Sequence, residues 1–386
     1  MIKKWQAKLI KAIYTIKVIF CLTQTHLGRC GYFMPITPLN FFSGCRLITA
    51  SAAGLLLFFG LAWLAGYGPS TSPFAVAAQA DSGPVGDVAE SQLITREPIQ
   101  PIPRQIAYDR EKAELGRRLF NETMLSLDHS ISCASCHDLN GGGHDPRPAS
   151  IGIHSRQGTM ASPTVFNAVF NFRQFWNGRA ADLREQAAGP LTDPLEMGMS
   201  EQEVERRLNE DPGYREAFSK IYGGRQVRFE QVLDALAEFQ RALITPDSLF
   251  DLYLRGEAVL MPQQQQGYLE FKELGCVTCH NGVNVGGNSF QKMGVIFPRE
   301  TDDERKIMDL NQVSGREEDR QVFKVPTLRN ITLTAPYFHD GSAADLPEAL
   351  QNMAHHNLGV ELSSRQIYLL VAFLETLTGQ RPTILK

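Results

Sequence analysis

The length, composition and charge of the chain set the first limits. With 386 residues, of which 43% are apolar and 21% charged, the sequence is that of a folded protein larger than a usual single domain. Its formal net charge of −4 at pH 7 excludes a strongly basic chain, and we expect no nucleic-acid partner. All acidic residues lie at or beyond Asp81. This acidic part either attracts a cationic partner or only aids solubility.

Residues 1–80 are predicted to form a basic N-terminus followed by a signal peptide or a membrane anchor. The first 46 positions carry only basic charges, and residues 47–66 form an uncharged run long enough to cross a bilayer. Positive charge before such a run fixes that end in the cytoplasm, so we expect the rest to be exported to the periplasm. The small residues of "AVAAQA", ending at Ala80, fit a cleavage site. The sequence fits both a signal peptide that is cleaved and a membrane anchor that is retained, and Met34 is an alternative start of translation.

The exported part is predicted to begin with a linker at 81–104, rich in Pro, Gly and Ser, followed by two domains at 105–255 and 256–386. The stretches "EKAELGRRLF" and "QQGYLEFKELG" have apolar residues at helical spacing, and each precedes a Cys-x-x-Cys-His motif and a Gly-rich stretch. This similarity is a weak internal repeat, which suggests two units of one kind.

Three further helices are predicted along the chain. "SEQEVERRL" opens with Ser200 as a capping residue, and "FEQVLDALAEFQRALI" places its apolar residues on one face. The last pattern, "SSRQIYLLVAFLETLTG", is expected to end at Gly379. No strand pattern of comparable strength occurs, so the fold is predicted to be mostly α with long loops.

The motif "CASCH" indicates a covalent haem site. Cys133 and Cys136 lie on one face of a helical turn, so both sulfurs can form thioethers with the vinyl groups of one haem, while His137 ligates the iron. We call these residues the first motif. The second motif, "CVTCH", consists of Cys276, Cys279 and His280. Two c-type haems are therefore expected, one in each of two cytochrome c-like domains; paired zinc sites and disulfides are the weaker alternatives.

Each haem iron needs either a second axial ligand, for electron transfer, or an open position, for catalysis. In "DLPEALQNMAHHNLG", Met353 follows Leu346 and Leu350 at helical spacing and can face a haem ring. Packing in the core is the alternative. The residues that compete for the ligand role are Met293, Met308, His355 and His356.

The segment after the first motif holds candidates for catalysis. Glu196 lies in the apolar loop "DPLEMGM", where burial would raise its pKa and suit it to acid–base work, although most single glutamates are only solvated. Trp176 either lies between cofactors or packs in the core, and the residues alone favour the core.

A set of motifs shared in order and spacing covers about residues 106–379 and resembles the bacterial di-haem cytochrome c peroxidases. The motifs are "CASCH", "SPTVFNAVFN", "QFWNGRAADLREQA", "LEMGM", "RALITPDSLFDLYLRG", "GCVTCHNGVNVGG" and "PTLRNITLTAPYFHDG". The resemblance implies a peroxidatic haem at the first motif and an electron-transfer haem at the second. It also implies that Met353 is the axial methionine of the second haem.

The same resemblance assigns roles around the first haem. Trp176 matches the tryptophan between the haems, Glu196 the distal acid–base carboxylate, and Gln186 a distal-pocket glutamine. An interdomain calcium in the family uses backbone carbonyls equivalent to those of Thr334 and Pro336.

Two departures from the family pattern bear on the site. Many members have a distal histidine that caps the peroxidatic iron, but an ungapped match places Ile153 at that position and His154 one residue later. His154 is therefore a weak candidate ligand, and the pocket is expected to be open without reductive activation. The calcium-binding asparagine aligns with Ala161, which weakens the expectation of calcium.

The predicted function is the reduction of hydrogen peroxide to water with electrons from a small cytochrome c or a cupredoxin. Family members are commonly dimers, so a homodimer is expected from the resemblance. One alternative is a relative that oxidises protein tryptophan, although those enzymes have tyrosine at the position of Met353. A non-catalytic di-haem electron carrier is the other.

Overall fold

The computed structural model describes residues 97–299 and 308–386, which lie within a compact unit, Gly83–Lys386. The predicted apolar run at 47–66, the cleavage site at Ala80 and most of the linker lie outside the described residues. Among the helices that are described, none is long and apolar enough to cross a membrane.

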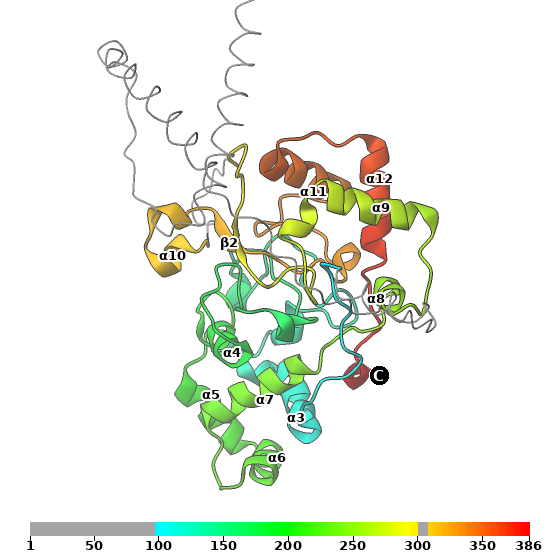
Figure 1. Ribbon diagram of the computed structural model, residues 1–386. Coiled ribbons are helices and arrows are strands. Elements are labelled where there is room, and N and C mark those ends of the chain that lie inside the picture. Colours follow the sequence, from blue (N-terminus) through cyan, green and yellow to red (C-terminus); the bar gives the residue numbers. More distant parts are fainter. Residues whose placement is uncertain (1–96, 300–307) are drawn as a thin grey trace, which may run out of the picture. The chain divides into compact units, whose positions relative to one another are not determined.

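Five helices form the first group, drawn from cyan to green in the lower half of Figure 1. They are α3 (Arg110–Phe120), α4 (Leu183–Thr192), α5 (Glu201–Glu210), α6 (Pro212–Tyr222) and α7 (Phe229–Arg241). The predicted cap of α5 is confirmed, because the Ser200 side chain accepts a hydrogen bond from the Glu203 amide at 3.2 Å. The buried faces of α3 and α7 contribute Leu119, Phe120 and Phe239 to one apolar core.

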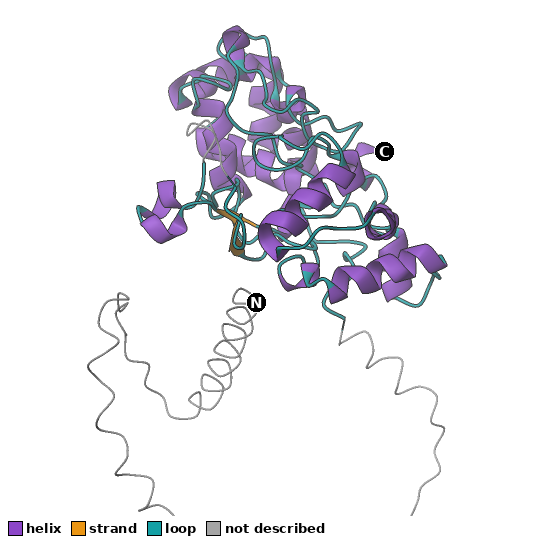
Figure 2. Cartoon of the chain, turned by 90° about the horizontal axis from the view of Figure 1, so that it is seen from above, coloured by secondary structure: helices purple, strands orange, loops and turns teal. Residues whose placement is uncertain are grey.

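The second group carries the C-terminal half of the chain. Its helices are α8 (Leu249–Leu254), α9 (Pro262–Glu273), α10 (Asn311–Ser314), α11 (Leu346–Met353) and α12 (Ser364–Glu375). A two-stranded antiparallel ribbon, β1 (Phe290–Lys292) with β2 (Val322–Lys324), is the sheet within the described residues. Helices and loops make up the rest of the described residues, drawn in purple and teal in Figure 2, so the prediction of a mostly α fold with long loops is confirmed.

The expected end of the last helix was wrong. α12 ends at Glu375, four residues before Gly379. Gly379 instead donates its amide hydrogen to the Asn330 side chain at 3.0 Å, and a Cβ at this position would lie 1.9 Å from the Thr245 carbonyl oxygen. Glycine is needed here for close backbone packing and not as a helix stop.

Both groups are built around the same helix crossing. α3 packs on α7 through Gly116, where a Cβ would lie 1.9 Å from the carbonyl oxygen of Ala235. α9 packs on α12 through Gly267 in the same way, because a Cβ at Gly267 would lie 1.9 Å from the carbonyl oxygen of Leu369. Any side chain would force these helices apart, so the repeat seen before the two motifs reflects a real duplication of packing.

The duplication extends to a second pair of segments that the sequence reading missed. "QFWNGRA" at 174–180 closes on itself through a bridge between Gln174 and Ala180, as "YFHDGSA" at 337–343 does between Tyr337 and Ala343. This places Trp176 and His339 at equivalent positions, because each is the third residue of its segment. The equivalence fixes which residues of the two halves correspond.

Candidate active site

The first motif lies on a short 3₁₀ turn, Cys133–Ser135, and not on an α-helix. The amides of Cys136 and His137 donate to the Cys133 carbonyl at 3.2 and 3.0 Å, which holds the three side chains together. The two thiols form no disulfide, and burial raises the pKa of Cys133 to about 12. Thiols held unpaired at this spacing are available for thioether formation with a haem.

The imidazole of His137 is prepared to bind a metal ion. Its Nδ1 lies 3.3 Å from the Gly143 carbonyl oxygen, which can only accept, so Nδ1 carries the proton and Nε2 keeps its lone pair. Burial lowers the pKa of His137 to about 4, so the ring is neutral at physiological pH. A neutral, oriented imidazole is the form that ligates iron.

The second motif repeats these features. The His280 amide donates to the Cys276 carbonyl at 3.0 Å, and His280 Nδ1 lies 3.4 Å from the Val285 carbonyl oxygen. Burial lowers the pKa of His280 to about 4 as well. Both predicted proximal histidines therefore have the same protonation and the same type of hydrogen-bond partner.

A large cavity opens beside the first motif. It contains about 1490 Å³ of empty space, including the part open to solvent. Cys133, Cys136 and His137 line it together with Phe120, Ala187 and Leu236. A cavity with two thiols, an imidazole and apolar side chains in its wall fits the chemistry of a covalently bound haem.

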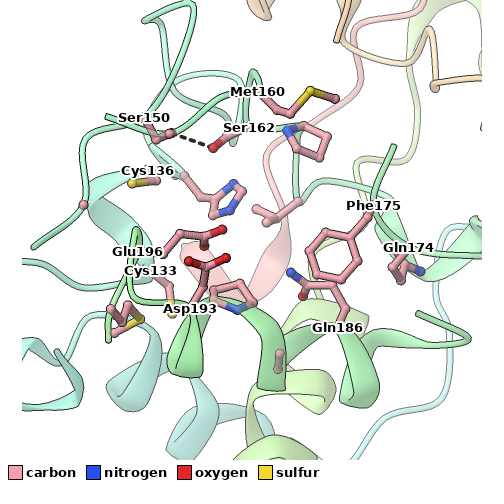
Figure 3. Close-up of a pocket in the computed structure, with 18 of the residues that line it drawn as sticks. Cys133, Cys136, Ser150, Met160, Ser162, Gln174, Phe175, Gln186, Asp193 and Glu196 are labelled. Carbon is pink, nitrogen blue, oxygen red and sulfur yellow. Dashed lines mark hydrogen bonds between the residues drawn. The ribbon is translucent and has the colours of Figure 1, made fainter. Parts of the chain in front are cut away.

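Glu196 points into this cavity beside Asp193, opposite Gln186 and Phe175 (Figure 3). Its loop is held by the Glu196 amide, which donates to the Asp193 carbonyl at 3.0 Å, and by the Ile153 amide, which donates to the Glu196 carbonyl at 2.9 Å. Burial raises the pKa of Glu196 to about 7, the Asp193 carboxylate adds to the rise, and the Arg179 guanidinium opposes it. The expected effect of the apolar loop is therefore present in the structure.

Trp176 lies in the cavity wall and contacts the other half of the protein. Its indole Nε1 donates to the Ala161 carbonyl at 2.8 Å, and its ring centroid lies 6.3 Å from that of His339, with 69° between the planes. The side chain is only partly buried. The interpretation as simple core packing, which the residues alone favoured, does not describe this position.

Known proteins resemble the chain in sequence and in fold. The family described as di-haem cytochrome c peroxidase matches residues 110–259. Cytochrome c551 peroxidase of Nitrosomonas europaea is 46% identical over 291 residues, covering 75% of this chain and 86% of the relative. The chain belongs to the di-haem cytochrome c peroxidase family.

A second relative and a solved structure agree with this family assignment. Cytochrome c551 peroxidase of Pseudomonas aeruginosa is 39% identical over 300 residues, covering 74% of this chain and 86% of the relative. The crystal structure of a MauG-like protein associated with microbial copper homeostasis has a TM-score of 0.63 and 28% identity, and covers 73% of this chain and 93% of the solved one. As a di-haem peroxidase, the protein has haem as its cofactor.

Among the described residues that line the first-motif cavity, no histidine besides His137 is present, so none corresponds to the histidine that the resemblance to the family implies as a cap on the iron. His154 is turned away: its Nδ1 lies 3.4 Å from Asp128 Oδ2, and it lines a separate pocket with Asp128 and Arg147. Ile153 is buried and packs against Gly198. The φ of His154 is 54°, in the left-handed region that residues other than glycine adopt uncommonly.

The expected calcium carbonyls belong to a loop that joins the two halves. Thr334 and Pro336 flank Ala335, whose carbonyl accepts a hydrogen bond from His144 Nε2 at 2.8 Å. The described ranges contain no group of three or more His, Cys, Asp or Glu side chains suited to a metal ion. Calcium on backbone carbonyls stays a prediction.

The duplicated architecture gives Met353 a counterpart. α4 and α11 begin alike, because Asp182 accepts from the Glu185 amide and Asp345 from the Glu348 amide, both at 2.9 Å. Counting from these caps, Met353 in α11 corresponds to Pro190 in α4, and Pro190 lines the first-motif cavity. The shared "AADL" before each helix could have revealed this in the sequence.

Met308, considered as a ligand for the second haem, lines the cavity of the first motif. His355 and His356 are engaged on the surface: the Nδ1 of His355 lies 2.7 Å from Glu361, and that of His356 lies 2.8 Å from the Phe297 carbonyl oxygen. Because these contacts engage Nδ1 and not Nε2, they do not exclude either histidine, and Met353 as axial ligand stays a prediction.

Proposed function

We propose that the protein reduces hydrogen peroxide to two molecules of water, using two protons and two electrons from a small donor such as a cytochrome c or a cupredoxin. The first motif holds the peroxidatic haem in the domain at 105–255. The second motif, with Met353 as sixth ligand, holds the electron-transfer haem in the domain at 256–386. When bound, the haems supply the redox chemistry that amino-acid side chains cannot.

The observation that carries this proposal is the difference between two equivalent positions. Met353 offers a thioether, which is a good axial ligand, whereas Pro190 has no atom able to bind iron. The half of the protein with Pro190 is also the half in which Glu196 has a pKa of about 7. A titratable carboxyl group therefore lies where peroxide can enter.

Glu196 acts as the acid–base group in this proposal. Its carboxylate takes a proton from one peroxide oxygen and delivers it to the other, which leaves as water when the O–O bond breaks. A pKa near 7 suits both transfers, since the group gives and accepts a proton at similar cost. Gln186 lies across the cavity from Glu196, where its amide can hydrogen-bond the substrate (Figure 3).

Trp176 is assigned the place between the haems. It lines the first-motif cavity and touches His339 of the other domain, so it connects the walls of the two sites. Export to the periplasm, with cleavage at Ala80 or a tether at 47–66, remains part of the proposal on the sequence pattern. A homodimer and calcium binding by the carbonyls of Thr334 and Pro336 are also part of the proposal, and they rest on the resemblance to the family.

Replacing Glu196 by Gln tests the proposal. The variant keeps the size of the side chain but cannot transfer the proton, so peroxide turnover should fall by roughly 100-fold or more. Both haems should remain attached. Glu201→Gln, on the exposed start of α5, is the matched control and should keep its activity.

The measurements are steady-state oxidation of a reduced cytochrome c by peroxide, and the haem content of each variant. Full activity of Glu196→Gln would remove this residue from the mechanism. A non-catalytic carrier would instead give no turnover in the unchanged protein, with both irons six-coordinate in every redox state.

A further inference from the structure

Lys324, at the end of β2, is a buried cation with no carboxylate partner among the described residues. Its exposed fraction is 5%, and no hydrogen bond or ion pair joins its ammonium to another residue within the ranges described. Burial lowers its pKa to about 8, so it is still charged at pH 7. Buried lysines are almost always paired, because an isolated charge loses its hydration.

Arg329 shows how this protein stabilises a buried cation elsewhere. Its guanidinium, also fully buried, lies 2.7 Å from Asp251 and donates to the Gln100 carbonyl at 2.8 Å. Lys324 has no comparable group among the described side chains.

The duplication shows beside which of the two motifs Lys324 lies. The Lys324 amide donates to the Trp176 carbonyl at 2.8 Å, and the Ala161 amide donates to the His339 carbonyl at 2.9 Å. Because Trp176 and His339 are equivalent, these bonds make Lys324 the counterpart of Ala161. Ala161 lines the cavity of the first motif. By the same correspondence, Lys324 belongs to the wall of the second haem site.

The residues that follow support this placement. Two positions after Ala161, the Pro163 backbone hydrogen-bonds to the ring of His137. Two positions after Lys324, the Pro326 backbone hydrogen-bonds to the ring of His280. Each segment therefore runs along the proximal side of one haem site, and the lysine is present only beside the second.

We propose that the Lys324 ammonium pairs with a carboxylate of the haem held by the second motif and raises the reduction potential of that haem. Haem carries two propionate groups, and these are the anions that a site of this kind brings into the protein. Reduction adds negative charge near the ammonium, so a fixed positive charge favours the reduced form. The inference rests on the proposed function, which places a haem at Cys276, Cys279 and His280.

The test is a spectroelectrochemical titration of the haem-loaded protein. Lys324→Met removes the charge and keeps the length of the side chain, so the midpoint potential of the second haem should fall while that of the first is unchanged. Lys324→Arg should retain the potential. Lys292→Met is the matched control, because Lys292 is an exposed lysine on the partner strand β1, and it should leave both potentials unchanged.

An unchanged second-haem potential in Lys324→Met, with both haems present by pyridine haemochrome assay, would overturn the inference. So would a shift confined to the first haem. If Lys324→Met does not take up haem, Lys324→Gln gives the same comparison with a polar side chain. A protein with one haem, or with no peroxide turnover, contradicts the proposed function instead.

Discussion

The carboxyl group of Glu196 should lower the stability of the protein at neutral pH. Its pKa is raised from 4.5 to about 7, mainly by burial. At about 1.36 kcal/mol per pKa unit, the rise corresponds to at most about 3 kcal/mol of unfavourable free energy for the ionised form in the folded protein. Active-site groups often carry such a cost.

The sign of the effect follows from the direction of the shift. The pKa of Glu196 is higher in the folded state than in the unfolded state. The favourable contribution of this carboxyl group to the free energy of unfolding is therefore present below pH 4.5 and is lost as the pH rises through 7. Glu196→Gln, which cannot ionise, should therefore be more stable than the unchanged protein at pH 8, by up to about 3 kcal/mol. At pH 4.5 the two proteins should be nearly equal in stability.

Urea unfolding of the haem-loaded proteins at the two pH values measures this difference, with Glu201→Gln again as control. Lower stability of Glu196→Gln at pH 8, or the same difference at both pH values, would refute the argument. The first result would mean that the carboxylate is well solvated or paired. The second would mean that the substitution changes packing and not ionisation.

Two further predictions concern the second domain. Met353→Leu should lower the reduction potential of one haem, because a thioether ligand raises that potential. Met293→Leu, which changes a buried methionine, should leave both potentials unchanged. A lower potential in Met293→Leu alone would assign the ligand to Met293. Gly267→Ala should destabilise the protein by at least about 2 kcal/mol in urea unfolding, because its Cβ would lie 1.9 Å from the Leu369 carbonyl. Gly213→Ala, whose Cβ would lie 3.2 Å from a side-chain oxygen of Asp211 and near no backbone atom, should change stability by less than about 1 kcal/mol, and equal effects of the two would contradict the close crossing.

Local sequence was enough to predict most of the helices and both motifs. The turn that brings Cys133, Cys136 and His137 together needs only backbone hydrogen bonds within five residues. Helix caps such as Ser200 are equally local. Gly379 was misassigned because a glycine after a helix pattern commonly marks a stop, whereas here it is required by a carbonyl that is distant in the sequence.

The sequence also contained the correspondence of Met353 and Pro190, in the repeated "AADL" before each helix. Its meaning was not visible there, because a repeat in letters does not show which helix face lines a cavity. The direction of His154 was equally hidden. In the structure the side chain lies beside the Asp128 carboxylate and lines a pocket other than the first-motif cavity.

The order of residues by itself determined the haem-binding motifs, the helical class and the membership of the family, since these depend on short-range spacing and on shared words of sequence. Only the tertiary structure decided the pKa of Glu196, the contact of Trp176 with His339 and the isolation of Lys324. Desolvation and pairing depend on atoms contributed by segments far apart in the chain. No local pattern specifies them.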